Sequence, residues 1–119
     1  MKFKEITSMP DVSIRIYQGA GAMQGYISVR RTFARTELDI RYNNRVEMLI
    51  SEDNKVLRIA RNECGKRKAQ GKEGALLISI PYKTLGLTLG AGIYVPKTSV
   101  DNKALLIDLE SIDAFAKKS

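Results

Sequence analysis

The sequence contains no histidine and no tryptophan, and Cys64 is its one cysteine among 119 residues. Without histidine there is no imidazole general base, no Ser-His-Asp or Cys-His arrangement and no His-ligated metal. A single cysteine excludes an intrachain disulfide and a cysteine cluster for zinc or iron–sulfur, and it fits a reducing compartment. These absences predict a cytoplasmic protein that is not an enzyme and needs no cofactor or metal. We expect Cys64 to be an inert thiol.

Long apolar segments are also missing. No hydrophobic run approaches the roughly 18 residues of a membrane span. The first residues, Met1-Lys2-Phe3-Lys4-Glu5, are charged and lack the apolar core of a signal peptide. We therefore expect no membrane association. The hydrophobic fraction of 44% is ordinary for a folded protein, and the length suits a single domain over residues 1–119.

Most of the chain alternates apolar and polar residues, a pattern typical of half-buried β-strands. The alternation predicts strands at residues 12–17, 26–33, 37–42, 46–50, 56–59, 75–80, 93–95 and 104–107. Near the end, a different spacing puts Leu109, Ile112, Phe115 and Ala116 on one helical face behind Asp108, a suitable N-cap. The sequence therefore predicts a mainly β domain with a short C-terminal helix.

Two pairs of segments resemble each other weakly. Residues 51–59 and 99–107 share the run Asp-Asn-Lys at their centres, and residues 27–29 resemble residues 78–80. Either the hairpins reuse Asp-Asn turns, or the chain contains a duplicated β unit.

Positive charge is concentrated in one part of the chain. Lys and Arg number 20 against 13 Asp and Glu, a formal charge of +7, and residues 30–72 hold twelve of these cations with six acids. A local positive field attracts polyanions, so we expect a nucleic-acid partner. Within this region, residues 61–74 are basic and rich in glycine. We predict a mobile loop there, either a solvated linker or a flap that orders on a bound strand.

The predicted strands also place cations and tyrosines together. If the isoleucines and valines of strands 12–17 and 26–33 point inward, Arg15, Tyr17, Tyr26 and Arg30 share an outer face, which Arg41 extends. Cations for phosphates and flat rings for bases are typical of single-strand recognition, although tyrosine and arginine are also common on ordinary strand surfaces. We expect stacking by Tyr17 and Tyr26 and a clamp from the loop. The candidate phosphate contacts are Arg15, Arg30, Arg31, Arg35, Arg41 and Arg58, and the clamp consists of Lys66, Arg67, Lys68 and Lys72.

The run Tyr26-Ile27-Ser28-Val29-Arg30, followed by Leu38-Asp39-Ile40-Arg41, resembles the paired strands of the positive-cofactor-four coactivators, which bind unpaired DNA on a curved sheet. Size, charge and β content are similar more broadly to the small single-stranded-DNA-binding proteins of bacteriophages. That resemblance implies an OB-like barrel and a role in DNA replication or recombination.

A second resemblance is to the AbrB and MazE type of swapped-hairpin DNA-binding regulators. It rests on Ile78-Ser79-Ile80-Pro81, Leu85-Gly86-Leu87, Gly90, Ile93-Tyr94-Val95 and Asp101-Asn102-Lys103-Ala104-Leu105. This resemblance implies a pseudo-symmetric barrel of two swapped-hairpin-like halves that binds duplex DNA as a transcription regulator.

Together these observations predict a non-catalytic protein that binds single-stranded DNA, with RNA left open, through a basic groove and aromatic stacking. The expected fold is an OB-like barrel, and a homo-oligomer is expected because strand-coating proteins commonly self-associate. The alternatives are the duplex-binding regulator and a scaffold that binds an acidic protein.

Overall fold

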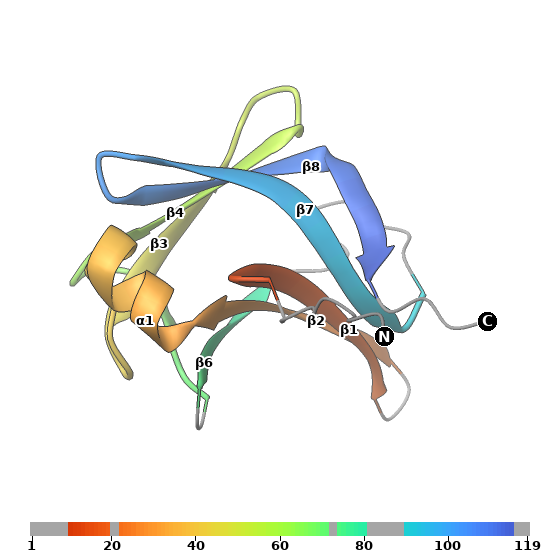
Figure 1. Cartoon of the computed structure of the whole chain (residues 1–119), viewed down its shortest axis with the longest axis horizontal. Coiled ribbons are helices and arrows are strands. Elements are labelled where there is room, and N and C mark those ends of the chain that lie inside the picture. The colour runs from red at the N-terminus through yellow and green to blue at the C-terminus, as the bar shows by residue number, and fades with distance from the viewer. Residues whose placement is uncertain (1–9, 20–21, 72–73, 81–89, 116–119) are drawn as a thin grey trace, which may run out of the picture.

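The computed structural model describes residues 10–19, 22–71, 74–80 and 90–115. Strands dominate, with one helical segment between the second and third of them (Figure 1). In chain order the elements are β1 (Val12–Gly19), β2 (Ala22–Arg30), α1 (Arg31–Phe33), the π-helical turn η1 (Ala34–Leu38), β3 (Arg45–Ile50), β4 (Val56–Arg61), β5 (Arg67–Lys68), β6 (Ala75–Ile80), β7 (Gly92–Asp101) and β8 (Ala104–Phe115).

The strands form one eight-stranded antiparallel sheet in the order β5-β3-β4-β8-β7-β1-β2-β6. The sheet curls so that β3, β4, β7 and β8 lie across from β1, β2 and β6, with α1 at one end (Figure 1). A bridge between Gln70, just after β5, and Leu77 of β6 brings the two edges together. The fold is thus mainly β, a nearly closed barrel consistent with the OB-like prediction.

The segment that brings the edges together lies in the predicted loop 61–74. Arg61 ends β4, and Arg67 and Lys68 pair with Val46 and Arg45 of β3. Ala69 is fully buried, and its N–H donates to the carbonyl of Asn44 at 2.9 Å. The described part of this segment is therefore built into the barrel by backbone pairing. Lys72 lies outside the described residues.

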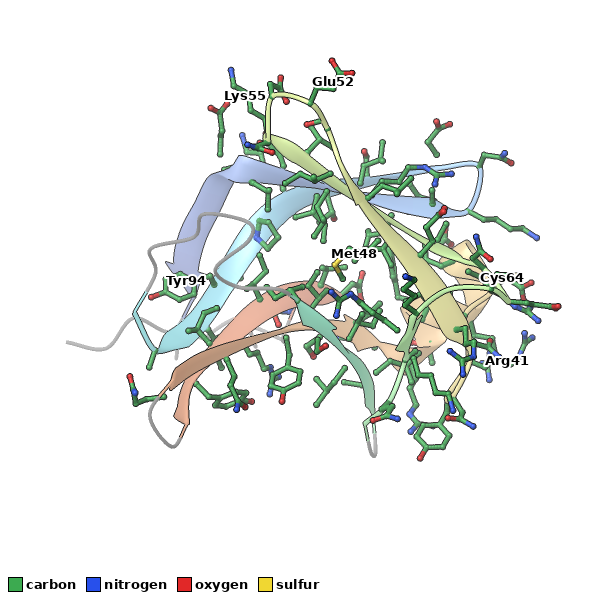
Figure 2. All side chains as sticks on the ribbon, turned by 180° about the vertical axis from the view of Figure 1, so that it is seen from behind. Arg41, Met48, Glu52, Lys55, Cys64 and Tyr94 are labelled. Atoms are coloured by element: carbon green, nitrogen blue, oxygen red, sulfur yellow. The ribbon has the colours of Figure 1, made fainter. Side chains whose placement is uncertain are left out.

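The alternation predicted from the sequence defines the inside of the barrel. Val12, Ile14 and Ile16 of β1 are at most 4% exposed, and the inward residues of β2, β4, β6 and β8 join them in one core. Burying each such side chain contributes about 1.5–3 kcal/mol, so this shared interior is the main stabilising feature. Figure 2 shows Met48 of β3 inside the barrel, where it packs against this core.

The predicted C-terminal helix is wrong. Residues 104–115 form β8, which pairs with β7 from Asp101–Ala104 to Ile93–Phe115 around a bulge between Val95 and Lys97. Asp108 does accept a backbone N–H, as an N-cap would, but from Glu110 at the bulge, at 3.0 Å. The helical spacing does not determine the structure of this segment, because β7 provides it with a backbone partner along most of its length.

The predicted strand 37–42 is also wrong. Its first residues belong to η1, yet Leu38 and Ile40 are both only 1% exposed. Asp39 between them has φ 55°, and this left-handed residue turns the chain so that Ile40 faces the core and its N–H donates to the Ala34 carbonyl at 3.0 Å. The burial of both Leu38 and Ile40 therefore comes from the left-handed turn at the end of η1, not from a β-strand.

Both similar segments containing Asp-Asn-Lys form hairpin turns. Asn54 lies in the β3–β4 turn with φ 60°, and Asn102 lies in the β7–β8 turn with φ 52°. Asparagine tolerates this left-handed conformation better than most residues, which explains its use in both turns. The strands that follow the two turns, β4 and β8, are direct neighbours in the sheet.

Candidate nucleic-acid interface

Three of the predicted site residues lie together on the outer face of β1 and β2. Arg15 is paired with Tyr26 across the two strands, and Tyr26 is paired with Ser79 of β6 on its other side. The ring of Tyr17, two residues after Arg15 and 46% exposed, meets the ring of Tyr26 edge to face at 5.8 Å between centroids. The outer face predicted for β1 and β2 therefore exists and carries tyrosine rings. The prediction that Arg41 extends this face is wrong, because residues 37–42 form no strand and Arg41 lies at the α1 end of the barrel.

Beside Tyr26 the surface is hollowed into a groove of about 550 Å3, which we call the basic groove. It lies between the outer face of β6 and the β5 segment. The side chains that define it are Tyr26, Arg45, Lys66, Arg67, Lys68 and Ser79, and among the described residues no carboxylate lines it. Four cations beside an aromatic ring make a surface complementary to a phosphate backbone with exposed bases.

Pairing between distant segments builds this groove. Arg45 is opposite Lys68 in the β3–β5 ladder, and the Arg67 guanidinium donates to the Ser79 hydroxyl at 3.3 Å across the groove. The turn before β5 depends on Gly65, because a Cβ there would overlap the carbonyl of Val46. The Gly65 carbonyl also accepts a hydrogen bond from the Arg45 guanidinium at 3.0 Å. A glycine thus lets the cation-bearing segment lie against β3.

Other predicted phosphate contacts are ion-paired with carboxylates. Arg41 contacts Asp39 at 2.8 Å, Arg30 contacts Asp11 at 3.4 Å and Arg58 contacts Glu47 at 3.8 Å. These pairs are partly exposed, where an ion pair contributes only about 0–1 kcal/mol, so a phosphate can compete for each arginine. By contrast, among the described residues no carboxylate lies within ion-pair distance of Lys66, Arg67 or Lys68.

Among the described residues, Asp39 is the one carboxylate with two arginines within ion-pair distance. The hydrogen bond from Arg41 lowers its pKa below the usual value, and the charges of Arg61, Arg41 and Lys103 act in the same direction. Arg61 approaches it at 3.1 Å. Asp39 therefore stays ionised and neutralises part of the positive charge at this end of the barrel.

Apart from Arg58, the predicted site residues that the structure describes fall into three neighbourhoods. Tyr26, Lys66, Arg67 and Lys68 share the basic groove, and Tyr17 adjoins it. A smaller hollow of about 280 Å3 on the same sheet face is lined by Arg15 and Arg30 with Ser13 and Ser28. Arg31, Arg35 and Arg41 gather at the α1 end of the barrel.

Arg58 lies elsewhere, on β4, where it lines a hollow with Asp39, Arg61 and Lys103. Sequence reasoning missed Arg45 as a groove residue. Its charge was visible, but only the β3–β5 pairing shows that it faces the same space as Lys66 and Lys68. Nothing in the alternation pattern signals that Ser79 would accept a hydrogen bond from Arg67.

Comparisons with protein families, curated proteins and solved structures give no match to this chain. The two family resemblances drawn from the sequence therefore stay predictions. Over the residues that the structure describes, no group of three or more His, Cys, Asp or Glu side chains could hold a metal ion. The same residues include no helix of the length and apolarity needed to cross a membrane.

Proposed function

We propose that this chain is a non-catalytic single-stranded DNA-binding protein that acts in the cytoplasm during DNA replication or recombination. The observation that carries the proposal is the basic groove, where Tyr26 lies beside Arg45, Lys66, Arg67 and Lys68, and where no carboxylate of the described part of the chain is a lining residue. The cations neutralise successive phosphates, and the tyrosine stacks on a base. Stacking is sequence-tolerant because every base has an aromatic face, so weak sequence preference is expected.

An unpaired strand fits this groove better than a duplex does. The phosphates of any nucleic acid can approach the cations, but a base can stack on Tyr26 only when its own face is free. The Tyr17 ring lies against Tyr26, so the two rings offer a second aromatic surface to a neighbouring base. The geometry of the groove favours neither DNA nor RNA, so the competition assay includes an unpaired strand of each type.

A competition binding assay tests the proposal. Labelled poly-dT is bound to the protein and challenged with unlabelled poly-dT, random duplex DNA and poly-U. We expect poly-dT to compete well and random duplex poorly. Stronger competition by random duplex DNA than by poly-dT would favour a duplex-binding protein such as the AbrB-like regulator. Failure of every oligonucleotide to bind would overturn nucleic-acid binding and leave the acidic-protein scaffold.

We also propose that the protein binds strands as a homo-oligomer. Leu49, Ile50 and Val56 are 36–47% exposed next to the β3–β4 turn, and such apolar side chains can be covered by a second copy. Light scattering after size exclusion tests this, since a monomer has a mass of 13.3 kDa. A monomeric mass with and without oligonucleotide would refute it.

A further inference from the structure

A second hollow lies at the end of the barrel, where the chain leaves η1 and turns into β3. It has a volume of about 300 Å3 and is lined by Arg31, Arg35, Ile40, Arg41, Tyr42 and Leu76. We call it the end pocket. Ile40 and Leu76 are each 1% exposed, so the floor is apolar. Three arginines and a tyrosine surround that floor.

The aromatic residue of this pocket is unusually open. Tyr42 is 55% exposed, and the Arg31 guanidinium lies over its ring at 5.5 Å from the centroid. An arginine in this position holds the ring by a cation–π contact. A fixed aromatic ring beside an apolar floor is suited to a flat heterocycle, since both surfaces gain from excluding water.

The cations of the pocket are suited to a negative group on that heterocycle. Arg35 is exposed, and among the described residues no carboxylate lies within ion-pair distance of it. Arg31 has a buried Nε for which the described residues provide no hydrogen-bond partner. A planar ring that carries a phosphate, which describes one nucleotide, matches both the aromatic and the cationic parts of the pocket.

The end pocket and the basic groove meet at Gly71. The Arg31 Nη2 of the end pocket donates to the Gly71 carbonyl at 3.3 Å, and Gly71 also lines the basic groove. Leu76 lines the end pocket and the adjacent Leu77 lines the basic groove. A strand that leaves the groove at Gly71 therefore comes next to Arg31 of the end pocket.

We propose that the end pocket holds one nucleotide of the same strand that occupies the basic groove. Its base packs on the Tyr42 ring and the apolar floor, and its phosphate lies beside Arg31 and Arg35. This inference rests on the proposed function, because it extends the path of the bound strand from the groove to the end of the barrel.

Fluorescence anisotropy with an oligo-dT of about 16 nucleotides, long for one barrel of this kind, tests the proposal. We expect Tyr42→Ala to weaken binding by about 5- to 150-fold, the loss typical of one stacked base. Tyr42→Phe should bind like the wild type because it keeps the ring. Arg35→Ala should also weaken binding. Lys55→Ala is the matched control for loss of one charge, since Lys55 lies at the β3–β4 tip, away from Arg41 (Figure 2).

A tryptophan at position 42 reports on the pocket directly, because the chain has no other tryptophan. The fluorescence of the Tyr42→Trp variant should be quenched by the oligonucleotide, whereas that of Glu52→Trp, at the β3–β4 tip, should not change. Titration with thymidine monophosphate shows whether the end pocket binds a free nucleotide or one that belongs to a strand. Quenching of Tyr42→Trp by the monophosphate, with none by the oligonucleotide, would overturn the shared path.

The outcomes distinguish this inference from the proposed function. If wild-type protein binds no oligonucleotide, the proposed function and the inference both fail. If wild-type protein binds the oligonucleotide but Tyr42→Ala binds equally well and Tyr42→Trp is not quenched, the function stands and the end pocket is not part of the site. Thermal unfolding of each variant checks that the barrel is intact, as expected for the exposed Tyr42 side chain.

Discussion

Tyr17 and Tyr26 meet edge to face on the outer side of β1 and β2, with ring centroids 5.8 Å apart and ring planes inclined by 61°. The two residues are not directly opposite each other, since Tyr26 is paired with Arg15 and Tyr17 with Gln24. The contact is therefore diagonal across the antiparallel pair, within the reach of aromatic side chains. It fixes the Tyr26 ring beside the basic groove before any ligand arrives.

Replacement of Tyr26 tests whether that ring stacks on a base. We expect Tyr26→Ala to weaken single-strand binding by about 1–3 kcal/mol and Tyr26→Phe to bind like the wild type, because the phenylalanine ring can still stack. Isothermal titration with oligo-dT measures both. An affinity for Tyr26→Ala equal to that of the wild type would remove this ring from the site.

The cations of the groove should set the salt dependence of binding. On a single strand each neutralised phosphate contributes roughly 0.7 to the slope of log affinity against log salt. The double variant Lys66→Ala, Lys68→Ala should reduce the slope by about 1.4. The pair Lys55→Ala, Lys103→Ala removes the same charge outside the groove and should reduce it less. Equal slopes for the two double variants would show that the groove is not where phosphates bind.

The sequence predicted much of the barrel because strand alternation is a local signal. Val12, Ile14 and Ile16 are in phase, and the structure buries all three. The alternation pattern gave a wrong prediction where the chain turns. Leu38 and Ile40 were predicted to lie on one face of a strand, but the left-handed Asp39 between them buries both residues without a strand. The helical spacing after Asp108 could not reveal that β7 would pair with the segment.

The candidate site was predicted in its chemistry but only partly in its geometry. Opposite orientations of neighbouring strand residues follow from the pleat, so the outward Arg15 and Tyr26 were predictable. The groove itself depends on β5 lying against β3 and on the bridge from Gln70 to Leu77. These contacts join segments distant in sequence, so the periodicity of a single strand cannot predict them. Which arginines are paired with carboxylates distant in sequence, such as Arg61 with Asp39, is equally non-local information.

Asp39 gives the protein a specific response to acid. The pKa of Asp39 is lowered in the folded state, chiefly by the hydrogen bond from Arg41. The Asp39 carboxyl therefore binds a proton less tightly in the folded protein than in the unfolded chain. The resulting stabilisation is complete above the ordinary carboxyl pKa near 3.8 and is lost as the pH falls through the lowered value. Thermal unfolding midpoints measured from neutral pH downward should show this loss.

Substitution of Asp39 isolates its contribution to the acid response. Asp39→Asn should lower the unfolding midpoint at neutral pH and flatten its decline in acid, because the amide does not titrate. Glu52→Gln, at the exposed β3–β4 tip, should leave the decline unchanged. If Asp39→Asn declines as steeply as the wild type, the acid response comes from other carboxylates.

Gly65 affects both the stability of the barrel and the position of the segment that lines the basic groove. A Cβ at this position would overlap the Val46 carbonyl, so Gly65→Ala must push the turn before β5 away from β3. Added atoms in a closely packed site typically cost about 1–3 kcal/mol, and we expect at least that loss in the free energy of unfolding by denaturant. Single-strand affinity should fall as well, because β5 carries Arg67 and Lys68. Gly90→Ala is the matched control, since no described residue has an atom within 4 Å of a Cβ built there, and it should change neither measurement. Wild-type stability in Gly65→Ala would mean that the turn does not need to approach β3 so closely.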